Sequence, residues 1–418
     1  MLRGHLHFRQ RGVRRAAAVL GGTLLMMSGV APEAGADDFR SHQWYLDSLR
    51  MPEIWKVSKG RGVTVAVLDS GISEVPELRG RVLPGKEVSN APTGSMRDKD
   101  NHGTNMAALI AGTGAGGGIQ GIAPEAKILP VKAVTHPPED SVDGVVSRGI
   151  RYAVSRGAKI INISLGAEGE EFYYRKTQKA VNEALAKGSL VFASVGNGGK
   201  KGNPVVYPAA LPGVVGVSAV DRSLKVASYS GNGEQVALAA PGDDIPWRCP
   251  ELTGRCNSGG TSQATAIASG SAALIWAKHP NWTNHQVLRV MMQTAGTPDG
   301  IVPSRYIGYG NVRPRLPLLE GKGNPGPPDV NPLLAREGAT EPNPSVGASP
   351  SPSAEAKEKA SKSAKPAEAP SGDKAEAKSG SGGDGEGSGL WIGVGAGAAT
   401  LAAVVGGVLF VRRRGRAL

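Results

Sequence analysis

Three residues of this chain have the types and the sequence settings of a nucleophile and its base. Ser262 lies in the small-residue run 257–264, before an Ala-rich segment, where a helix N-terminus would offer a free N–H to a developing oxyanion. His102 precedes the apolar stretch 106–111, and Asp69 follows an apolar run. Taken singly, Asp69 suits a turn, His102 an ordinary hydrogen bond and Ser262 a helix cap. Together they could perform acyl transfer: Ser262 attacks, His102 moves the proton and Asp69 orients the imidazole.

The elements that must position these side chains follow a pattern of apolar runs separated by helical periodicity. Continuous apolar runs predict strands buried on both faces, and the stretches between them predict helices. Strands are expected at 63–68, 126–133, 159–165, 190–195 and 214–220, and helices at 106–111, 142–155, 177–186 and 262–277. The prediction is an α/β fold with a mostly parallel central sheet and helices on both faces, and ligands bind at the carboxyl ends of such strands.

The N-terminus has the layout of a secretory signal peptide. Five arginines precede the apolar run 16–30, and Ala34-Gly35-Ala36 then offers small residues for cleavage. We expect cleavage after Ala36, which leaves residues 37–55 as a short N-terminal extension and residues 56–316 as the folded domain.

The C-terminal quarter has the layout of a tether and an anchor. Residues 317–389 are rich in Pro, Ala, Ser and Gly and predict a disordered linker. Residues 390–411 form an uncharged apolar segment of 22 residues, and the basic tail 412–418 follows at once. This length predicts one transmembrane helix with its basic end in the cytoplasm, so the folded domain is expected outside the cell, at the membrane.

Charge and cysteine content exclude several other classes of function. The formal net charge is +12, but the signal segment and the tail contribute +4 each, which leaves an ordinary +4 and no reason to expect a nucleic-acid partner. The only two cysteines, Cys249 and Cys256, predict a disulfide in an exported protein. No group of Cys or His residues in the sequence has the spacing of a zinc site. The acidic residues Asp98, Asp100, Asp140 and Asp143 lack calcium-loop spacing, so we expect no metal and no cofactor.

The three motifs occur in the order Asp, His, Ser, which is the order in subtilisin. The chain resembles the subtilisin-like serine proteases at 67–71 (Val-Leu-Asp-Ser-Gly), 102–104 (His-Gly-Thr) and 260–264 (Gly-Thr-Ser-Gln-Ala). This resemblance implies a subtilisin-like three-layer fold, the triad Asp69, His102 and Ser262, and a serine endopeptidase that acts on protein or peptide substrates. The family usually has proline where this chain has Ala266, which should change rigidity modestly and leave activity intact.

The same resemblance implies an oxyanion hole and a substrate cleft. Asn197 would supply a side-chain amide beside the Ser262 N–H. Two segments would wall the primary specificity pocket, the first of them at an edge where the substrate pairs as an added strand. They are Ser164, Leu165 and Gly166 on one side and Ser194, Val195 and Gly196 on the other. The segment Tyr207-Pro208-Ala209 is similar to a family segment that contains a cis proline.

Residues 42–49 and 54–55 resemble the short N-terminal extension of the mycosins, membrane-anchored subtilases associated with type VII secretion systems. The tether and anchor match the same layout. The resemblance implies processing of exported proteins and contact with type VII membrane components. Two alternatives stay open: a general degradative surface protease, and a mainly structural subunit of the secretion complex.

Overall fold

The computed structural model describes residues 38–90, 92–93, 96–134, 141–297, 300, 302–335 and 391–392. The predicted signal segment, the tail and almost all of the predicted transmembrane segment lie outside the described residues. Among the residues that are described, no helix is long and apolar enough to cross a membrane.

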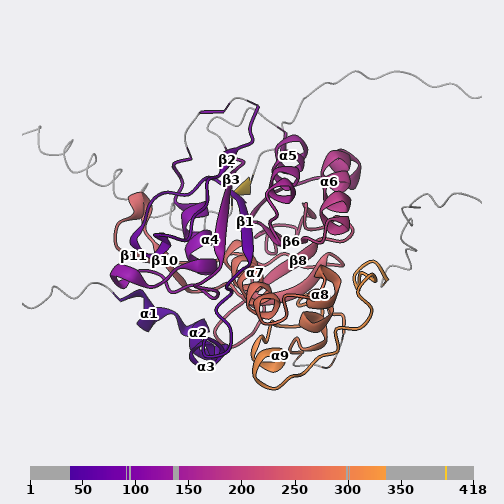
Figure 1. Cartoon of the computed structure of the whole chain (residues 1–418). Helices are drawn as coiled ribbons and strands as arrows, with labels where there is room; N and C mark the ends of the chain where they lie inside the picture. Colours follow the sequence, from indigo (N-terminus) through magenta and orange to yellow (C-terminus); the bar gives the residue numbers. More distant parts are fainter. Residues whose placement is uncertain are drawn as a thin grey trace, which may run out of the picture.

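A seven-stranded sheet forms the centre of the domain (Figure 1), in the order β2-β3-β1-β4-β6-β8-β9. Every pairing within it is parallel, as the continuous apolar runs predicted. Its strands are β1 (Thr64–Asp69), β2 (Lys86–Glu87), β3 (Lys127–Lys132), β4 (Ile160–Ile163), β6 (Leu190–Ser194), β8 (Val215–Val220) and β9 (Val236–Pro241).

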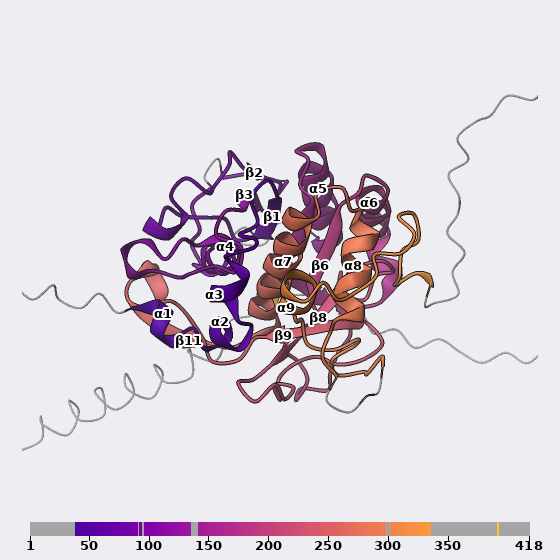
Figure 2. The ribbon, with the colours of Figure 1, turned by 60° about the horizontal axis from the view of Figure 1, so that its bottom comes forward.

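Helices cover both faces of this sheet, and a separate hydrophobic core fills each space. Along β1, Val65 and Val67 enter one core while Ala66 and Leu68 enter the other, because successive side chains of a strand point to opposite faces. The first face carries α4 (His102–Ala111), α7 (Thr261–Lys278) and α8 (Asn284–Gln293), and the second carries α5 (Val142–Ser155) and α6 (Arg175–Ala186) (Figures 1 and 2). The predicted three-layer α/β architecture is therefore confirmed.

Helix α7 runs through the first core and is buried from Thr261 to Trp276. Small residues make this possible, because they let neighbouring elements approach the helix backbone. At Gly270, an added Cβ would lie 2.7 Å from the Cβ of Ile122. The Ala-rich sequence after Ser262 thus serves close packing, and the helix holds its N-terminus rigidly at the edge of the sheet.

The N-terminal extension packs against the domain. It forms α1 (Phe39–His42), α2 (Trp44–Ser48) and α3 (Met51–Ile54), and most of its apolar side chains are buried. The Gln43 side chain exchanges two hydrogen bonds with the Gln120 backbone, at 2.8 and 2.9 Å. These contacts make the extension part of the folded unit.

The folded unit also continues beyond residue 316, the predicted end of the folded domain. Helix α9 (Arg315–Leu319) crosses that position, and Leu318, Asn331 and Leu333 are buried. The Arg289 guanidinium donates to the carbonyls of Pro327 and Val330 at 2.9 and 2.5 Å. Composition alone placed the boundary too early, because a Pro-rich segment without secondary structure can still be held by hydrogen bonds.

Several short strands and 3-10 helices lie outside the central sheet. Strands β5 (Leu165–Glu168) and β7 (Val206–Tyr207) are antiparallel, and β12 (Trp391–Ile392) pairs antiparallel with the other side of β5. The hairpin of β10 (Ile245–Arg248) and β11 (Arg255–Ser258) precedes α7. Four short 3-10 helices complete the described elements: η1 (Pro76–Leu78), η2 (Ala115–Gly117), η3 (Glu171–Tyr174) and η4 (Pro250–Leu252).

Candidate active site

Asp69 is the last residue of β1 and lies at the carboxyl edge of the sheet, 1% exposed. Its Oδ1 atom accepts hydrogen bonds from the Ser70 backbone N–H at 2.8 Å and from His102 Nδ1 at 2.7 Å. A buried carboxylate needs such donors, because burial without them is costly. The acid therefore lies where parallel-strand topology predicts a site, and it already engages the histidine.

His102 is the first residue of α4, and the close approach of this helix to β1 explains the flanking residues. Asn101 turns the chain through a left-handed conformation (φ 61°), which asparagine tolerates better than most residues. An added Cβ at Gly103 would lie 2.3 Å from the Gly71 carbonyl oxygen and 3.0 Å from Asp69 Cβ. Only glycine therefore allows the helix to begin this close to the strand end.

The hydrogen bond to Asp69 assigns the proton on His102 to Nδ1, because a carboxylate oxygen can only accept. His102 Nε2 is then the basic nitrogen, and it is buried with no hydrogen-bond partner among the described residues. Burial lowers the pKa of His102, but the Asp69 charge and hydrogen bond, with Asp98 and Asp100, raise it, and the net shift is upward. The imidazole is thus held as a base with an open nitrogen.

Asp98, which sequence reasoning singled out only as a weak calcium candidate, anchors the start of α4. Its Oδ2 accepts from the Thr104 backbone N–H at 2.8 Å and the Thr104 hydroxyl at 2.7 Å. Its Oδ1 accepts from the Ser70 hydroxyl at 2.8 Å, and Ser70 in turn accepts from the Gly103 N–H at 3.0 Å. Burial raises the pKa of the Asp98 carboxyl against the lowering effect of these hydrogen bonds. In the sequence, Asp98 could have been recognised as an acidic residue shortly before the start of a helix.

Ser262 is the second residue of α7, so its backbone N–H is among those that no carbonyl within the helix can accept. Its hydroxyl donates to the Ser164 carbonyl at 3.3 Å, while the Ser164 hydroxyl donates to the Ser262 carbonyl at 3.3 Å. The structure thus pairs the two serines and leaves His102 Nε2 unengaged. Catalytic hydrogen bonds are often absent until substrate binds, so the triad that the resemblance implies would need the Ser262 hydroxyl to turn from Ser164 to His102.

Asn197 contacts the start of the same helix. Its Oδ1 accepts from the Thr261 N–H at 2.9 Å and from the Thr261 hydroxyl at 3.1 Å. These donors fix which end of the amide is oxygen, so the NH₂ group points the other way. An added Cβ at Gly260 would lie 3.4 Å from that nitrogen, which shows that the amide borders the Gly-rich entry to Ser262. This arrangement suits a second oxyanion donor beside the Ser262 N–H.

The two predicted substrate segments end neighbouring parallel strands. Ser164 follows β4 and leads into β5, and Ser194 ends β6, with Val195 and Gly196 after it. Strands β4 and β6 pair directly, with Ile163 opposite Ala193, so both segments emerge at one edge. The side of β5 away from β7 pairs antiparallel with β12, at Leu165 and Gly166. This edge therefore accepts an extended strand, and a substrate peptide would pair there in place of β12.

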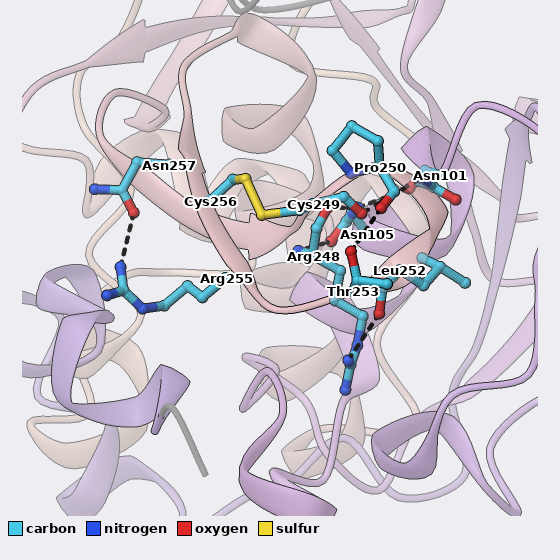
Figure 3. The surroundings of a disulfide bond; sticks show 10 residues. All are labelled: Asn101, Asn105, Arg248, Cys249, Pro250, Leu252, Thr253, Arg255, Cys256 and Asn257. Atoms are coloured by element: carbon cyan, nitrogen blue, oxygen red, sulfur yellow. Dashed lines mark hydrogen bonds between the residues drawn. A yellow bond between two sulfur atoms is a disulfide. The ribbon is translucent and has the colours of Figure 1, made fainter. Parts of the chain in front are cut away.

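The predicted disulfide Cys249–Cys256 is present and closes the β10–β11 hairpin (Figure 3). The hairpin also reaches the histidine helix. The Asn105 side chain accepts from the Arg248 N–H at 2.7 Å and donates to the Arg248 carbonyl at 3.2 Å, and Asn101 donates to the Cys249 carbonyl at 3.4 Å. Because β11 runs into the segment that carries Ser262, the hairpin connects the base and the nucleophile elements.

An ion pair anchors the hairpin on its other side. Arg248 donates to both oxygens of Glu77, at 2.7 Å each, and the Glu77 side chain is fully buried. The Trp247 and His102 rings lie nearly perpendicular to each other, with their centroids 6.3 Å apart. Sequence reasoning did not find these contacts, since the residues lie more than 140 positions apart along the chain.

The acidic residues considered for calcium are used otherwise or fall outside the described residues. Asp98 caps α4 as described, and Asp143 accepts from the Thr177 N–H at 2.7 Å. Asp140 lies outside the described residues. Within the described part of the chain, no group of three or more His, Cys, Asp or Glu side chains could hold a metal ion. The Tyr207–Pro208 peptide bond is cis, as the resemblance implied.

A parallel α/β sheet with the buried pair Asp69 and His102 at its carboxyl edge, and with Ser262 at the start of a buried central helix, places the domain in the subtilisin-like class. The chain belongs to the subtilase family, whose pattern matches residues 60–310. Among curated proteins it is similar to the minor extracellular protease Epr of Bacillus subtilis, with 34% identity over 279 residues. That alignment covers 66% of this chain and 42% of Epr, so the chain spans less than half of that relative's length.

Among solved structures the chain is similar to MycP1 from Mycobacterium smegmatis, with a TM-score of 0.60 and 27% identity over 72% of this chain and 89% of that one. It is also similar to the MycP3 protease from the type VII (ESX-3) secretion system, with a TM-score of 0.57 and 28% identity. That match covers 68% of this chain and 89% of MycP3. These neighbours agree with the mycosin resemblance read from the sequence.

Proposed function

We propose that this protein is a serine endopeptidase that cleaves peptide bonds through an acyl-enzyme intermediate. The observation that carries the proposal is the buried 2.7 Å hydrogen bond between Asp69 and His102 Nδ1, which leaves Nε2 as the open base. A buried acid–base pair together with a serine at a helix N-terminus suits acyl transfer, and family membership supports the same chemistry.

In the first half of the reaction, Ser262 Oγ forms a bond to the substrate carbonyl carbon and its proton passes to His102 Nε2. Asp69 stabilises the imidazolium that results. The negative charge on the carbonyl oxygen is held by the Ser262 N–H and the Asn197 amide. The carbon–nitrogen bond then breaks as His102 gives its proton to the leaving amine. Water attacks the acyl-enzyme by the same steps in reverse and releases Ser262.

The catalytic assignment is tested with a Ser262→Ala variant and a fluorophosphonate probe that labels an activated serine. The wild-type protein should be labelled and should cleave a peptide, whereas the folded variant should do neither. Peptide turnover by the purified Ser262→Ala variant at the wild-type rate would contradict the assignment of the nucleophile. Circular dichroism of both proteins serves as the control for folding.

We further propose that the protein acts outside the cell, is anchored by residues 390–411 and processes exported proteins as part of a type VII secretion system. The signal-like N-terminus, the linker and the apolar C-terminal segment support the location. The similarity to MycP1 and MycP3 supports the partner, because MycP3 is by name a type VII protease. Removal of residues 390–418 should release the protein from membranes in fractionated cells.

A secretion assay separates this role from the alternatives. Deletion of the gene should abolish type VII export, and comparison with the Ser262→Ala strain shows whether export needs proteolysis or only the folded protein. Normal export after deletion, together with broad cleavage of unfolded proteins, would instead indicate a general degradative protease. Export that survives in the Ser262→Ala strain but fails after deletion would indicate a mainly structural role.

A further inference from the structure

Val206 lies between the two segments that flank the candidate substrate cleft. It is the first residue of β7, which pairs with β5 so that Val206 is opposite Glu168. One of its methyl groups, Cγ1, lies 2.8 Å from the position of a Cβ added at Gly166, and the other, Cγ2, lies 2.6 Å from that of a Cβ added at Gly196. The isopropyl group therefore touches the backbone of both segments at once.

The surrounding structure holds Val206 in this place. The residue is 7% exposed, and its strand is fixed by the pairing with β5. The next residue, Tyr207, stacks on Tyr174 with ring centroids 4.6 Å apart. An added Cβ at Gly166 would also lie 2.5 Å from the Tyr207 carbonyl oxygen, so the β7 backbone itself contacts the first segment. A substrate side chain cannot push Val206 aside without disturbing this pairing.

The position of the oxyanion donors decides which substrate residue meets Val206. The carbonyl that Ser262 attacks must sit at the Ser262 N–H and the Asn197 amide, and Gly196 is adjacent to Asn197 in the chain. The residue that owns this carbonyl is the one before the cleaved bond. A substrate backbone that took the place of β12 along Leu165 and Gly166 of β5 would direct this side chain toward Gly166 and Gly196, where Val206 contacts both.

We propose that Val206 makes the primary specificity pocket shallow, so that the enzyme selects Gly, Ala or Ser before the cleaved bond and rejects bulky aromatic or branched side chains. This inference rests on the proposed endopeptidase function. Pocket size is an effective basis for such selection, because a substrate side chain that overfills a packed site cannot be accommodated without strain.

The test compares two peptides that differ only in the residue before the cleaved bond, Ala in one and Phe in the other. The ratio of kcat/KM for Ala over Phe should exceed about tenfold in the wild-type enzyme, and Val206→Gly should lower this ratio by about tenfold or more, since one methylene already gives 10- to 200-fold discrimination. Val206→Ala should give an intermediate ratio. Val205→Gly is the matched control, because Val205 is 43% exposed and should leave the ratio unchanged.

Melting temperatures and fluorophosphonate labelling accompany each variant, so that a loss of folding is not mistaken for a change in selectivity. A wild-type enzyme that cleaves both peptides equally well would overturn the proposal, as would a folded, labelled Val206→Gly variant with an unchanged ratio. A wild-type protein that is not labelled would contradict the proposed protease function itself, which is a different failure.

Discussion

The Oδ1 atom of Asn197 accepts a hydrogen bond from the backbone N–H of Thr261 at 2.9 Å. The oxygen of this side chain thereby accepts from the first residue of α7, while its nitrogen is the proposed donor to the attacked carbonyl oxygen. The two ends of the amide can be separated by mutation, because aspartate keeps the acceptor and loses the donor.

Asn197→Asp should lower kcat by about 10²- to 10³-fold, the usual loss when an oxyanion donor is removed. It should leave stability near the wild-type value, because the carboxylate still accepts from Thr261 and a negative charge suits a helix N-terminus. Asn197→Ala should lose a similar amount of kcat and also about 1 kcal/mol of stability through the lost cap. Peptide kinetics and urea unfolding measure both effects. Wild-type kcat in Asn197→Asp would argue against the donor role.

The acid side of the pH profile should report His102. The base must be neutral to accept a proton, and the carboxylates around it raise its pKa above the ordinary 6.5. We therefore expect kcat/KM to be lost as pH falls through a midpoint above 6.5 and to be retained at higher pH, since this parameter follows the free enzyme.

The Asp98→Asn variant sharpens that measurement. Asp98 is one of the carboxylates that raise the pKa of His102, so its neutralisation should move the midpoint to lower pH. Asp47→Asn is the control, because the Asp47 side chain is 68% exposed on the N-terminal extension. An unchanged midpoint in folded Asp98→Asn would show that Asp98 acts only through its hydrogen bonds to Thr104 and Ser70.

Loss of the disulfide should lower stability by about 2 to 3 kcal/mol, as expected for a short closed loop. We expect Cys249→Ser/Cys256→Ser to melt at a lower temperature than the wild type. Because the hairpin also contacts Asn101 and Asn105 beside His102, kcat should fall as well, whereas the preference for Ala over Phe should not change. The same melting temperature with and without reductant would contradict this expectation.

The Glu77–Arg248 ion pair gives a second test of the hairpin. Arg248→Met leaves the fully buried Glu77 carboxylate without its partner and should cost about 3–5 kcal/mol in the free energy of unfolding. The double variant Glu77→Leu/Arg248→Met removes both charges and should recover much of that loss. If the double variant is as unstable as Arg248→Met alone, the loss in the free energy of unfolding comes from lost packing and not from the uncompensated charge.

Local patterns in the sequence predicted most of the central architecture. Helix α5 has the predicted bounds, and α7 and the strands β1, β3, β4, β6 and β8 differ from prediction by one or two residues at an end. Strand β9, helix α8 and the β10–β11 hairpin were not predicted. Strand β9 was missed because its Ala-rich sequence has weak strand preference, and the hairpin because its stability comes from a disulfide and from contacts with α4.

The sequence by itself determined the α/β class, the disulfide partners and the residue types available for acyl transfer, because each depends on neighbouring residues or on composition. The tertiary structure alone decided which distant groups meet. It joins Asp69 to His102, ties Asp98 into the start of α4, pairs the Ser262 hydroxyl with Ser164 and sets Val206 between Gly166 and Gly196. Such contacts depend on the register of parallel strands and on close packing at glycines. Neither of these can be predicted from a local sequence pattern.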